Sequence, residues 1–114
     1  MSLMKKSGKE VEQFMIYSVE LDPTKGAEIK KTRPCVVISP TAMNLHLSTV
    51  IVAPLTHTIK SFPTRVFSQV NGEEGQVVLE QIRAVDKNRL KRKFGKVDLS
   101  TSENIKLVMQ TMFS

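Results

Sequence analysis

The sequence predicts a small, mainly β domain, either a barrel or a strongly bent sheet, that ends in one C-terminal helix. Short apolar runs follow one another at close spacing between turn-forming residues, and no helical repeat separates them. Only the last residues show the i, i+3, i+4, i+7 spacing of a buried helical face. The length of 114 residues suits one domain, and 40% hydrophobic with 25% charged residues is an ordinary globular composition.

The strand candidates lie between turn signals, at residues 14–21, 35–38, 50–55, 64–70 and 77–79. Residues 22–26, Asp-Pro-Thr-Lys-Gly, predict a turn because proline presets φ and glycine accepts a positive φ. Asn71-Gly72 predicts a tight hairpin. We expect residues 1–13 to form a flexible lead-in, whose Met-Ser-Leu start before a second methionine resembles an added tag, and residues 14–114 to form the single domain.

The C-terminal segment predicts a helix with its own start signal. Ser100 and Glu103 have the spacing of a capping box, in which each side chain bonds a backbone N–H at the helix entrance. One face then carries apolar residues at helical spacing: Ile105, Val108, Met109 and Met112. We expect this helix to close the open side of the sheet.

A rigidly held arginine precedes the second strand candidate. Pro34 fixes its own φ and keeps Arg33 out of the helical region, so Arg33 should enter the strand extended. The apolar run that follows ends at Pro40. A guanidinium at the rim of a packed sheet suits a phosphate, because its planar fork offers two parallel donors.

The overall charge favours an anionic partner. Lysine and arginine number 17 against 11 acidic residues, which gives a net charge of +6. Nucleic acid is the first candidate, and an acidic protein is the second. The single cysteine, Cys35, lies in an apolar strand candidate, where a buried structural thiol is expected. No apolar run is long enough to span a membrane and no signal peptide is evident, so we expect no membrane association and a cytoplasmic location.

The chemical candidates are polar residues at predicted strand ends. The two histidines, His46 and His57, have no cysteine or carboxylate partners at ligand spacing, so no metal site is expected. No phosphate-binding loop, dinucleotide turn or nucleophile elbow is present, and no cofactor is expected. What remains is one set of side chains beside or within loops: Glu28, Lys31, Arg33, Thr56, Gln81 and Arg83.

Four segments, in this order, resemble the MazF/PemK (Kid)-type toxins, the mRNA interferases of type II toxin–antitoxin systems. They are Leu21 to Glu28 (Leu-Asp-Pro-Thr-Lys-Gly-Ala-Glu), Lys31-Thr32-Arg33-Pro34, Pro54-Leu55-Thr56 and Glu80 to Asp86 (Glu-Gln-Ile-Arg-Ala-Val-Asp). Each is weak alone, and their order and spacing carry the signal. The resemblance covers about residues 14–113.

The resemblance implies a small SH3-like β-barrel of the CcdB/MazF-like toxin fold, with short helices and a C-terminal helix. It implies a metal-independent endoribonuclease that cuts single-stranded RNA at short sequences, through attack by the ribose 2′-hydroxyl to leave a 2′,3′-cyclic phosphate. Arg33 and Thr56 would form the catalytic pair, and Glu28 matches a position that carries an acid in some relatives. Gln81 and Arg83 match positions near the RNA groove, and Lys31, His57 and Lys60 are further RNA contacts by proximity in sequence.

The resemblance also implies partners and leaves the proton carrier open. We expect a homodimer, nucleic-acid binding, and an acidic antitoxin of the MazE/PemI type that suits the positive charge. Glu28 is a candidate general base, whereas an arginine stays protonated and is a poor one. Relatives usually begin the first strand with a Gly-Asp pair, often with a tryptophan soon after. Here Phe14 and Met15 stand at those positions, followed by Tyr17 and Ser18.

Two alternatives from other classes remain at this stage. One is a non-enzymatic gyrase poison with the same barrel, as in CcdB-type toxins, which act through a C-terminal segment that bears tryptophan. This chain has no tryptophan. The other is a catalytically silent barrel that binds RNA or protein, against which the intact Arg33 and Thr56 argue.

Overall fold

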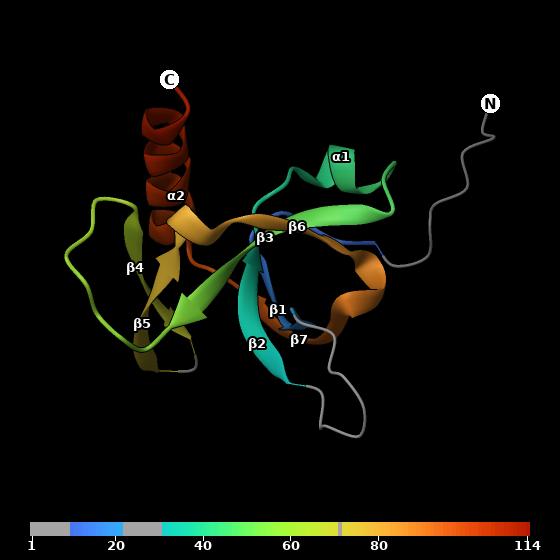
Figure 1. Ribbon diagram of the computed structural model, residues 1–114, viewed down its shortest axis with the longest axis horizontal. Helices are drawn as coiled ribbons and strands as arrows, with labels where there is room; N and C mark the ends of the chain where they lie inside the picture. Colours follow the sequence, from blue (N-terminus) through green and yellow to red (C-terminus); the bar gives the residue numbers. More distant parts are fainter. Residues whose placement is uncertain (1–9, 22–30, 71) are drawn as a thin grey trace.

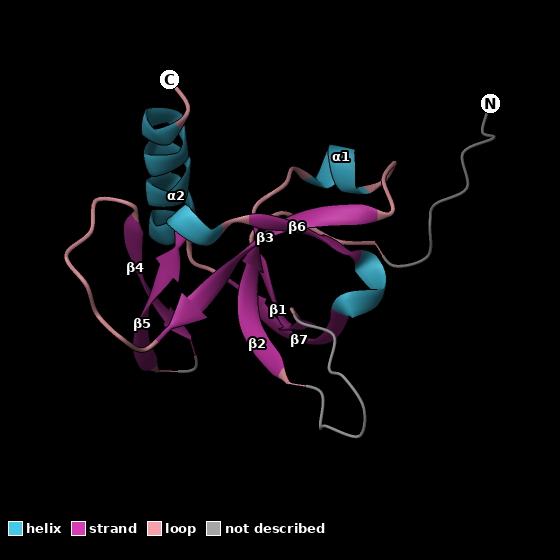
Figure 2. Ribbon diagram, in the orientation of Figure 1, coloured by secondary structure: helices cyan, strands magenta, loops and turns pink. Residues whose placement is uncertain are grey.

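The fold is a bent antiparallel sheet with one long helix at its side (Figure 1, Figure 2). A computed structural model describes residues 10–21, 31–70 and 72–114. Its elements in chain order are β1 (Met15–Glu20), β2 (Thr32–Val37), α1 (Thr41–Asn44), β3 (Thr49–Thr56), β4 (Arg65–Val70), β5 (Glu73–Val78), the 3₁₀ turn η1 (Leu79–Gln81), β6 (Arg83–Asp86), the 3₁₀ turn η2 (Lys87–Arg89), β7 (Leu90–Lys96) and α2 (Leu99–Met112).

Strand β3 is the centre of the sheet. The strand order is β4-β5-β3-β2-β1-β7, and β6 also pairs with β3. The first half of β3 pairs with β6, from Thr49 opposite Asp86 to Val52 opposite Arg83, whereas its last residues pair with β5. Among the described residues no ladder joins β7 to β4. The sheet is therefore strongly bent but not closed, and the predicted mainly β class is confirmed.

The bend creates two separate cores, one on each face of the sheet. The first core, on the face of β3 that carries Val50 and Val52, contains ten buried residues: Val11, Met15, Tyr17, Val19, Cys35, Val37, Val50, Val52, Val85 and Leu90. The second core lies on the opposite face: Phe14, Ile16, Val36, Ile38, Ala53, Val66, Val77, Leu79, Val97 and Ile105. Helix α2 stands beside β4 and β5 (Figure 1) and covers the second core, where Val108, Met109 and Met112 pack with Ile105 as predicted.

The sequence predicted five of the strands and the last helix, and it missed β6 and β7. The predicted start of the helix was wrong by two residues. Asp98 is the N-cap, and its carboxylate accepts a hydrogen bond of 2.8 Å from the Thr101 N–H. Ser100 and Glu103 therefore lie inside the helix rather than forming a capping box. No helix in the described part of the chain is long and apolar enough to cross a membrane.

Phe14, just before β1, has a backbone conformation that residues other than glycine rarely adopt. Its φ is +69°, in the left-handed region that favours glycine. Two hydrogen bonds hold it there: its N–H donates to the Val37 carbonyl at 2.7 Å, and its carbonyl accepts from the Val97 N–H at 3.1 Å. The ring is buried in the second core with the Lys106 ammonium 5.6 Å from its centroid. Packing and these bonds therefore stabilise a strained backbone.

A buried polar cluster fixes the segment before β1 to α1 and to the residues that follow β2. The Asn44 amide donates to the carbonyls of Val11 and Ser39, both at 3.0 Å, and its oxygen accepts from the Ser39 hydroxyl at 2.6 Å. The buried Lys87 ammonium donates to the Asn44 backbone carbonyl. Every polar atom named here has a partner, as buried polar groups require.

Candidate active site

Arg33 and Thr56 lie at the same end of neighbouring strands. The β2–β3 ladder pairs Cys35 with Pro54, and the same register carried two residues further sets Arg33 across from Thr56. Because side chains alternate along a strand, Arg33 shares a face with Cys35, and Thr56 shares the same face with Val52. Cys35 and Val52 belong to the first core. The two predicted catalytic side chains therefore lie at the open end of that core.

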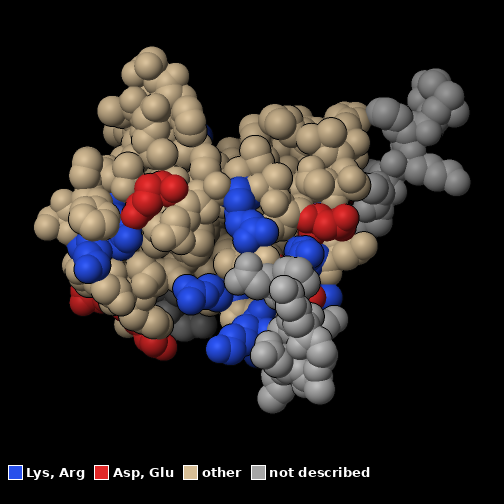
Figure 3. Space-filling model, in the orientation of Figure 1, with Lys and Arg blue, Asp and Glu red and all other residues tan. Residues whose placement is uncertain are grey.

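Arg83 approaches the same end from the other side of β3. It pairs with Val52 and shares its face with Val85, another residue of the first core. Burial raises the pKa of the Cys35 thiol to about 12, against the positive charges of Arg33 and Arg83, which both lower it. The Cys35 thiol therefore lies within the positive field of both arginines. Figure 3 shows lysine and arginine side chains gathered in the middle of the visible side of the molecule, around β2, β3 and β6.

The Thr56 hydroxyl is positioned by the turn that follows β3. Its oxygen accepts a hydrogen bond of 3.1 Å from the Thr58 N–H, a local pattern common for threonine in turns. This bond uses an acceptor site and leaves the hydroxyl proton for a donor role. The side chain is half-buried, at the boundary between core and solvent.

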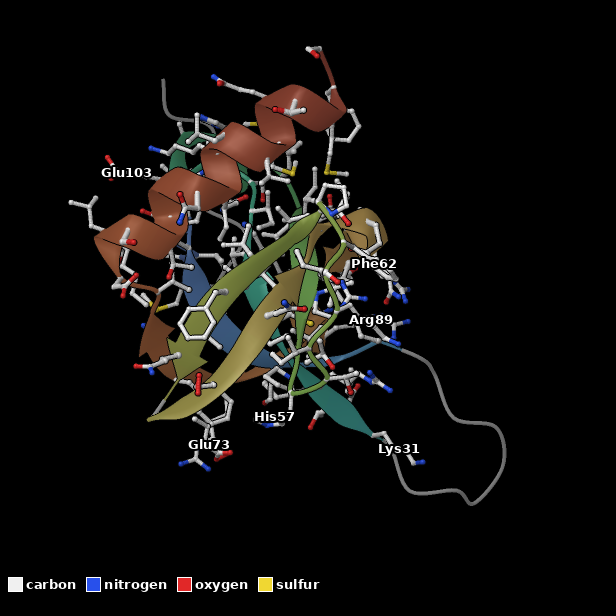
Figure 4. The ribbon with its side chains drawn as sticks, turned by 90° about the vertical axis from the view of Figure 1, so that its left-hand side faces the viewer. Lys31, His57, Phe62, Glu73, Arg89 and Glu103 are labelled. Atoms are coloured by element: carbon white, nitrogen blue, oxygen red, sulfur yellow. The ribbon has the colours of Figure 1, made fainter. Side chains whose placement is uncertain are left out.

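His57 follows Thr56 and is anchored to the start of β5. Its Nδ1 is 3.2 Å from the Glu74 carbonyl oxygen, so Nδ1 must carry the proton because a carbonyl only accepts. Its Nε2 is 3.7 Å from Glu73 Oε2. Both side chains are exposed, and Figure 4 shows His57 and Glu73 at the same end of the sheet. The imidazole therefore has a fixed orientation at the rim of the site.

Lys31 and Lys60 are both exposed to solvent, one before β2 and the other after β3. Lys31 precedes β2 and lies beyond its end (Figure 4). Lys60 belongs to the loop between β3 and β4, which the buried Gln76 side chain holds in place. The Gln76 oxygen accepts from the Lys60 N–H, and its amide donates to the Lys60 carbonyl, both at 3.0 Å. The loop backbone is thus fixed while the lysine head group stays free to meet an anion.

Gln81 is presented by η1, which is tied to β4 through Glu80. The Glu80 carboxylate accepts from Arg65 Nε at 2.9 Å and from the Thr64 hydroxyl at 2.7 Å. Partial burial opposes ionisation of Glu80, but these hydrogen bonds and the Arg65 charge outweigh it and lower the pKa of the carboxyl. Arg65 is nearly buried, and its guanidinium lies 5.1 Å from the Phe62 ring centroid. Arg65 therefore holds η1 in place through Glu80. Gln81 and Arg83, on either side of the end of η1, are exposed to solvent.

One predicted catalytic residue, Glu28, lies outside the described residues, as does the predicted turn at 22–26. In residues 10–21, 31–70 and 72–114, no three histidine, cysteine or carboxylate side chains are grouped as metal ligands. The chemistry visible here comes from guanidinium, hydroxyl, imidazole and ammonium groups.

A pocket of about 130 Å³ beside Thr56 was not expected from the sequence. Its lining combines the ends of β2 and β3, the β4–β5 hairpin and β7: Pro34, Leu55, Thr56, His57, Ser68, Glu73, Glu74, Gly75 and Phe94. Ser68 is 1% exposed, and its hydroxyl has no hydrogen-bond partner among the described residues. Sequence reasoning could not find this pocket, because the strand that carries Phe94 was not predicted.

Comparison with known proteins assigns the family. Residues 12–113 match the family model described as PemK-like, MazF-like toxin of type II toxin–antitoxin system. The chain belongs to this family. A curated relative, Endoribonuclease MazF of Staphylococcus saprophyticus, is 38% identical over 84 residues, which cover 68% of this chain and 70% of that protein.

Solved structures have the same fold. An endoribonuclease from a mycobacterial species superposes with a TM-score of 0.77 at 23% identity, over 92% of both chains. A MazE–MazF structure from Deinococcus radiodurans gives a TM-score of 0.78 at 20% identity, over 92% of this chain and 96% of the other. A mycobacterial endoribonuclease in complex with its cognate antitoxin gives 0.75 at 24% identity, over 90% and 94%. These similarities confirm the MazF-like toxin fold.

Proposed function

We propose that this MazF-like protein is a sequence-specific endoribonuclease that cuts single-stranded RNA without a metal ion and inhibits growth as the toxin of a toxin–antitoxin pair. The observation that supports the proposal is that the register places Arg33, Thr56 and Arg83 on the same face of the neighbouring strands β2, β3 and β6. The curated relative named Endoribonuclease MazF supports the activity. The cytoplasm is the compartment in which such a protein would meet messenger RNA.

The chemistry follows from the groups at this end of the sheet. The ribose 2′-oxygen attacks the adjacent phosphorus and loses its proton to a base, and the 5′-oxygen leaves with a proton from an acid. The products are a 2′,3′-cyclic phosphate and a 5′-hydroxyl. Arg33 would stabilise the charge on the non-bridging oxygens, and the Thr56 hydroxyl would donate a further hydrogen bond there. Glu28 is the proposed base.

The surrounding cations would hold the RNA. Lys31, Lys60 and Arg83 would contact phosphates, and His57 and Gln81 would bond phosphates or base edges. Binding should therefore weaken as salt rises, because each neutralised phosphate releases counterions. DNA of the same sequence should bind through its phosphates and remain uncut, since it has no 2′-hydroxyl.

Two protein partners complete the proposal. An acidic antitoxin of the MazE/PemI type would cover the positive surface, as the solved complexes of relatives with antitoxins suggest. A second copy of the chain would cover an apolar groove of about 480 Å³ beside α2, whose lining includes Phe14, Ile51, Met109 and Phe113. Sedimentation of the purified protein tests the homodimer.

The decisive experiment incubates a defined single-stranded RNA with the purified protein in EDTA. We expect discrete cuts with cyclic-phosphate ends. Arg33→Ala should lower the rate by ~10²–10³, the usual effect of removing one transition-state donor, with an unchanged melting temperature because the side chain is exposed.

Lys96→Ala is the matched control. It also removes one exposed positive charge from the sheet, but Lys96 pairs with Met15 at the opposite end of β1 from the residue that pairs with Arg33. This variant should cut at the wild-type rate. If Arg33→Ala cuts as fast as Lys96→Ala, the site is wrong. Intact RNA with undiminished toxicity would instead favour a silent binding barrel or a gyrase poison.

A further inference from the structure

The pocket beside Thr56 contains a buried polar group without a partner. The Ser68 hydroxyl lies in the pocket wall and makes no hydrogen bond to any described residue. A buried hydroxyl in this state is destabilising compared with a methyl group. Because Ser68 lines the pocket, the partner that its hydroxyl lacks would be a ligand that enters the pocket.

The size and walls of the pocket suit one flat ring. A cavity of roughly 150 Å³ is known to accept benzene, and this pocket measures about 130 Å³. Pro34, Leu55 and Phe94 supply apolar walls, and the Arg92 guanidinium lies over the Phe94 ring at 5.1 Å from its centroid. A pyrimidine base has this size and shape, whereas a purine has a second ring that would remain outside.

The charge at the mouth of the pocket distinguishes between the pyrimidines. Glu73 and Glu74 line it in a chain whose net charge is +6. Carboxylates repel phosphate, so the occupant should be the base of a nucleotide and not its phosphate. A carboxylate accepts from the N4 amine of cytosine. Uracil has a carbonyl oxygen, O4, at that position, and its lone pairs would repel those of the carboxylate.

The position of the pocket connects it to the cut. Thr56 and His57 line the pocket, and Pro34 follows Arg33 directly. The pocket depends on Gly75, which pairs with Ser68 across the β4–β5 hairpin. A Cβ at Gly75 would lie 2.7 Å from the Thr56 carbonyl oxygen. The hairpin therefore approaches the end of β3 as closely as it does because residue 75 has no side chain.

We infer that this pocket holds a cytosine base of the RNA next to the cut bond, that Ser68 donates a hydrogen bond to its ring nitrogen N3, which in uracil carries a hydrogen, and that Glu73 accepts from its amine. The inference rests on the proposed RNA cleavage and names the base that the site selects. A base must leave its stack to enter, which explains a requirement for single-stranded RNA.

The test reads cleavage sites in an RNA of random sequence at nucleotide resolution. The wild-type protein should favour cytosine over uracil at one position within two nucleotides of the cut. Ser68→Ala should lower that preference about threefold to tenfold, the effect of one neutral hydrogen bond, and should melt at or above the wild-type temperature. Glu73→Gln should also lower it, because an amide can donate to uracil O4. Ser100→Ala, on the exposed surface of α2, should change neither property.

A binding measurement separates this inference from the proposed function. The probes are fluorescent oligomers of ten nucleotides, one of 2′-deoxycytidine and one of 2′-deoxyuridine. Neither can be cleaved by this mechanism, because both lack the attacking 2′-hydroxyl. The deoxycytidine oligomer should bind more tightly, and Ser68→Ala should narrow the difference about threefold to tenfold. RNA cleavage without a Ser68-dependent cytosine preference would overturn the pocket assignment and leave the nuclease standing. Absence of cleavage together with Ser68-dependent cytosine binding would overturn the nuclease and support the pocket, and equal binding of both oligomers would overturn the pocket.

Discussion

The strained backbone at Phe14 predicts an unusual order of stability between two variants. In Phe14→Ala and Phe14→Gly the ring is lost, which costs about 3–5 kcal/mol for a residue that is only 8% exposed. At a φ of +69° alanine keeps a steric penalty of about 1–2 kcal/mol, which glycine does not have. Glycine loses about 0.5–1 kcal/mol more than alanine through chain entropy. Phe14→Gly should therefore be more stable than Phe14→Ala by roughly 0.5–1 kcal/mol.

Urea denaturation of the two variants measures this difference directly. The neighbouring Met15 provides the control, because it is also buried but has no positive φ. At Met15 the alanine variant should be the more stable one, as at an ordinary strand position. If alanine is also the more stable replacement at Phe14, the strain argument is refuted.

Three further predictions concern a thiol, a glycine and a helix cap. Burial raises the pKa of Cys35 to about 12, so the thiol should resist iodoacetamide at pH 8 until urea unfolds the protein. Above the ordinary pKa of 9.0 the thiol ionises in the unfolded chain while it stays protonated in the folded protein, so the folded state loses stability as the pH rises toward 12. The free energy of unfolding of the wild type should therefore fall more over this range than that of Cys35→Ala. Gly75→Ala should lower the free energy of unfolding by about 1–3 kcal/mol and slow cleavage, because the new Cβ displaces the end of β3. If urea denaturation and RNA cleavage are unchanged, the Thr56 backbone can move away from the new Cβ without cost, and the prediction is wrong. Asp98→Ala should lower the melting temperature and Asp98→Asn should preserve it, since asparagine also caps a helix. Hydrogen bonds from Thr101 lower the pKa of the Asp98 carboxyl, so this contribution is present at neutral pH and is lost as the pH falls through the lowered value; equal melting of both variants would contradict the cap.

The strands that the sequence predicted carry apolar residues in a continuous or alternating pattern. β2 and β3 carry continuous apolar runs that are buried on both faces, so composition alone indicates them. β7 has one buried residue, Leu90, followed by exposed lysine, arginine, phenylalanine and glycine. Its strand structure comes from pairing with β1, which no local pattern reveals. The helix cap was misassigned because aspartate and serine cap equally well, and only the path of the chain selects Asp98.

The candidate site was predictable in its residues but not in its arrangement. Arg33 and Thr56 were expected from short motifs, yet their common face depends on the register of β2 against β3. Arg83 joins them through the pairing of β6, a strand that was not predicted. The roles assigned to these residues, and to Glu28, remain predictions. The pocket around Ser68 requires four separate segments of the chain to meet, so its detection depends on tertiary structure.

The pairing of β1 with β7 has a consequence for how the chain folds. β1 and β2 are close in sequence and can pair early, but the other edge of β1 is completed only by β7, near the end of the chain. Contacts between such distant segments require closure of a large loop and slow the folding of β proteins. Until β7 arrives, one side of β1 exposes unpaired backbone groups, which are a template for association with other chains. A newly made chain of this protein therefore passes through an aggregation-prone stage whose length is set by the docking of its last strand.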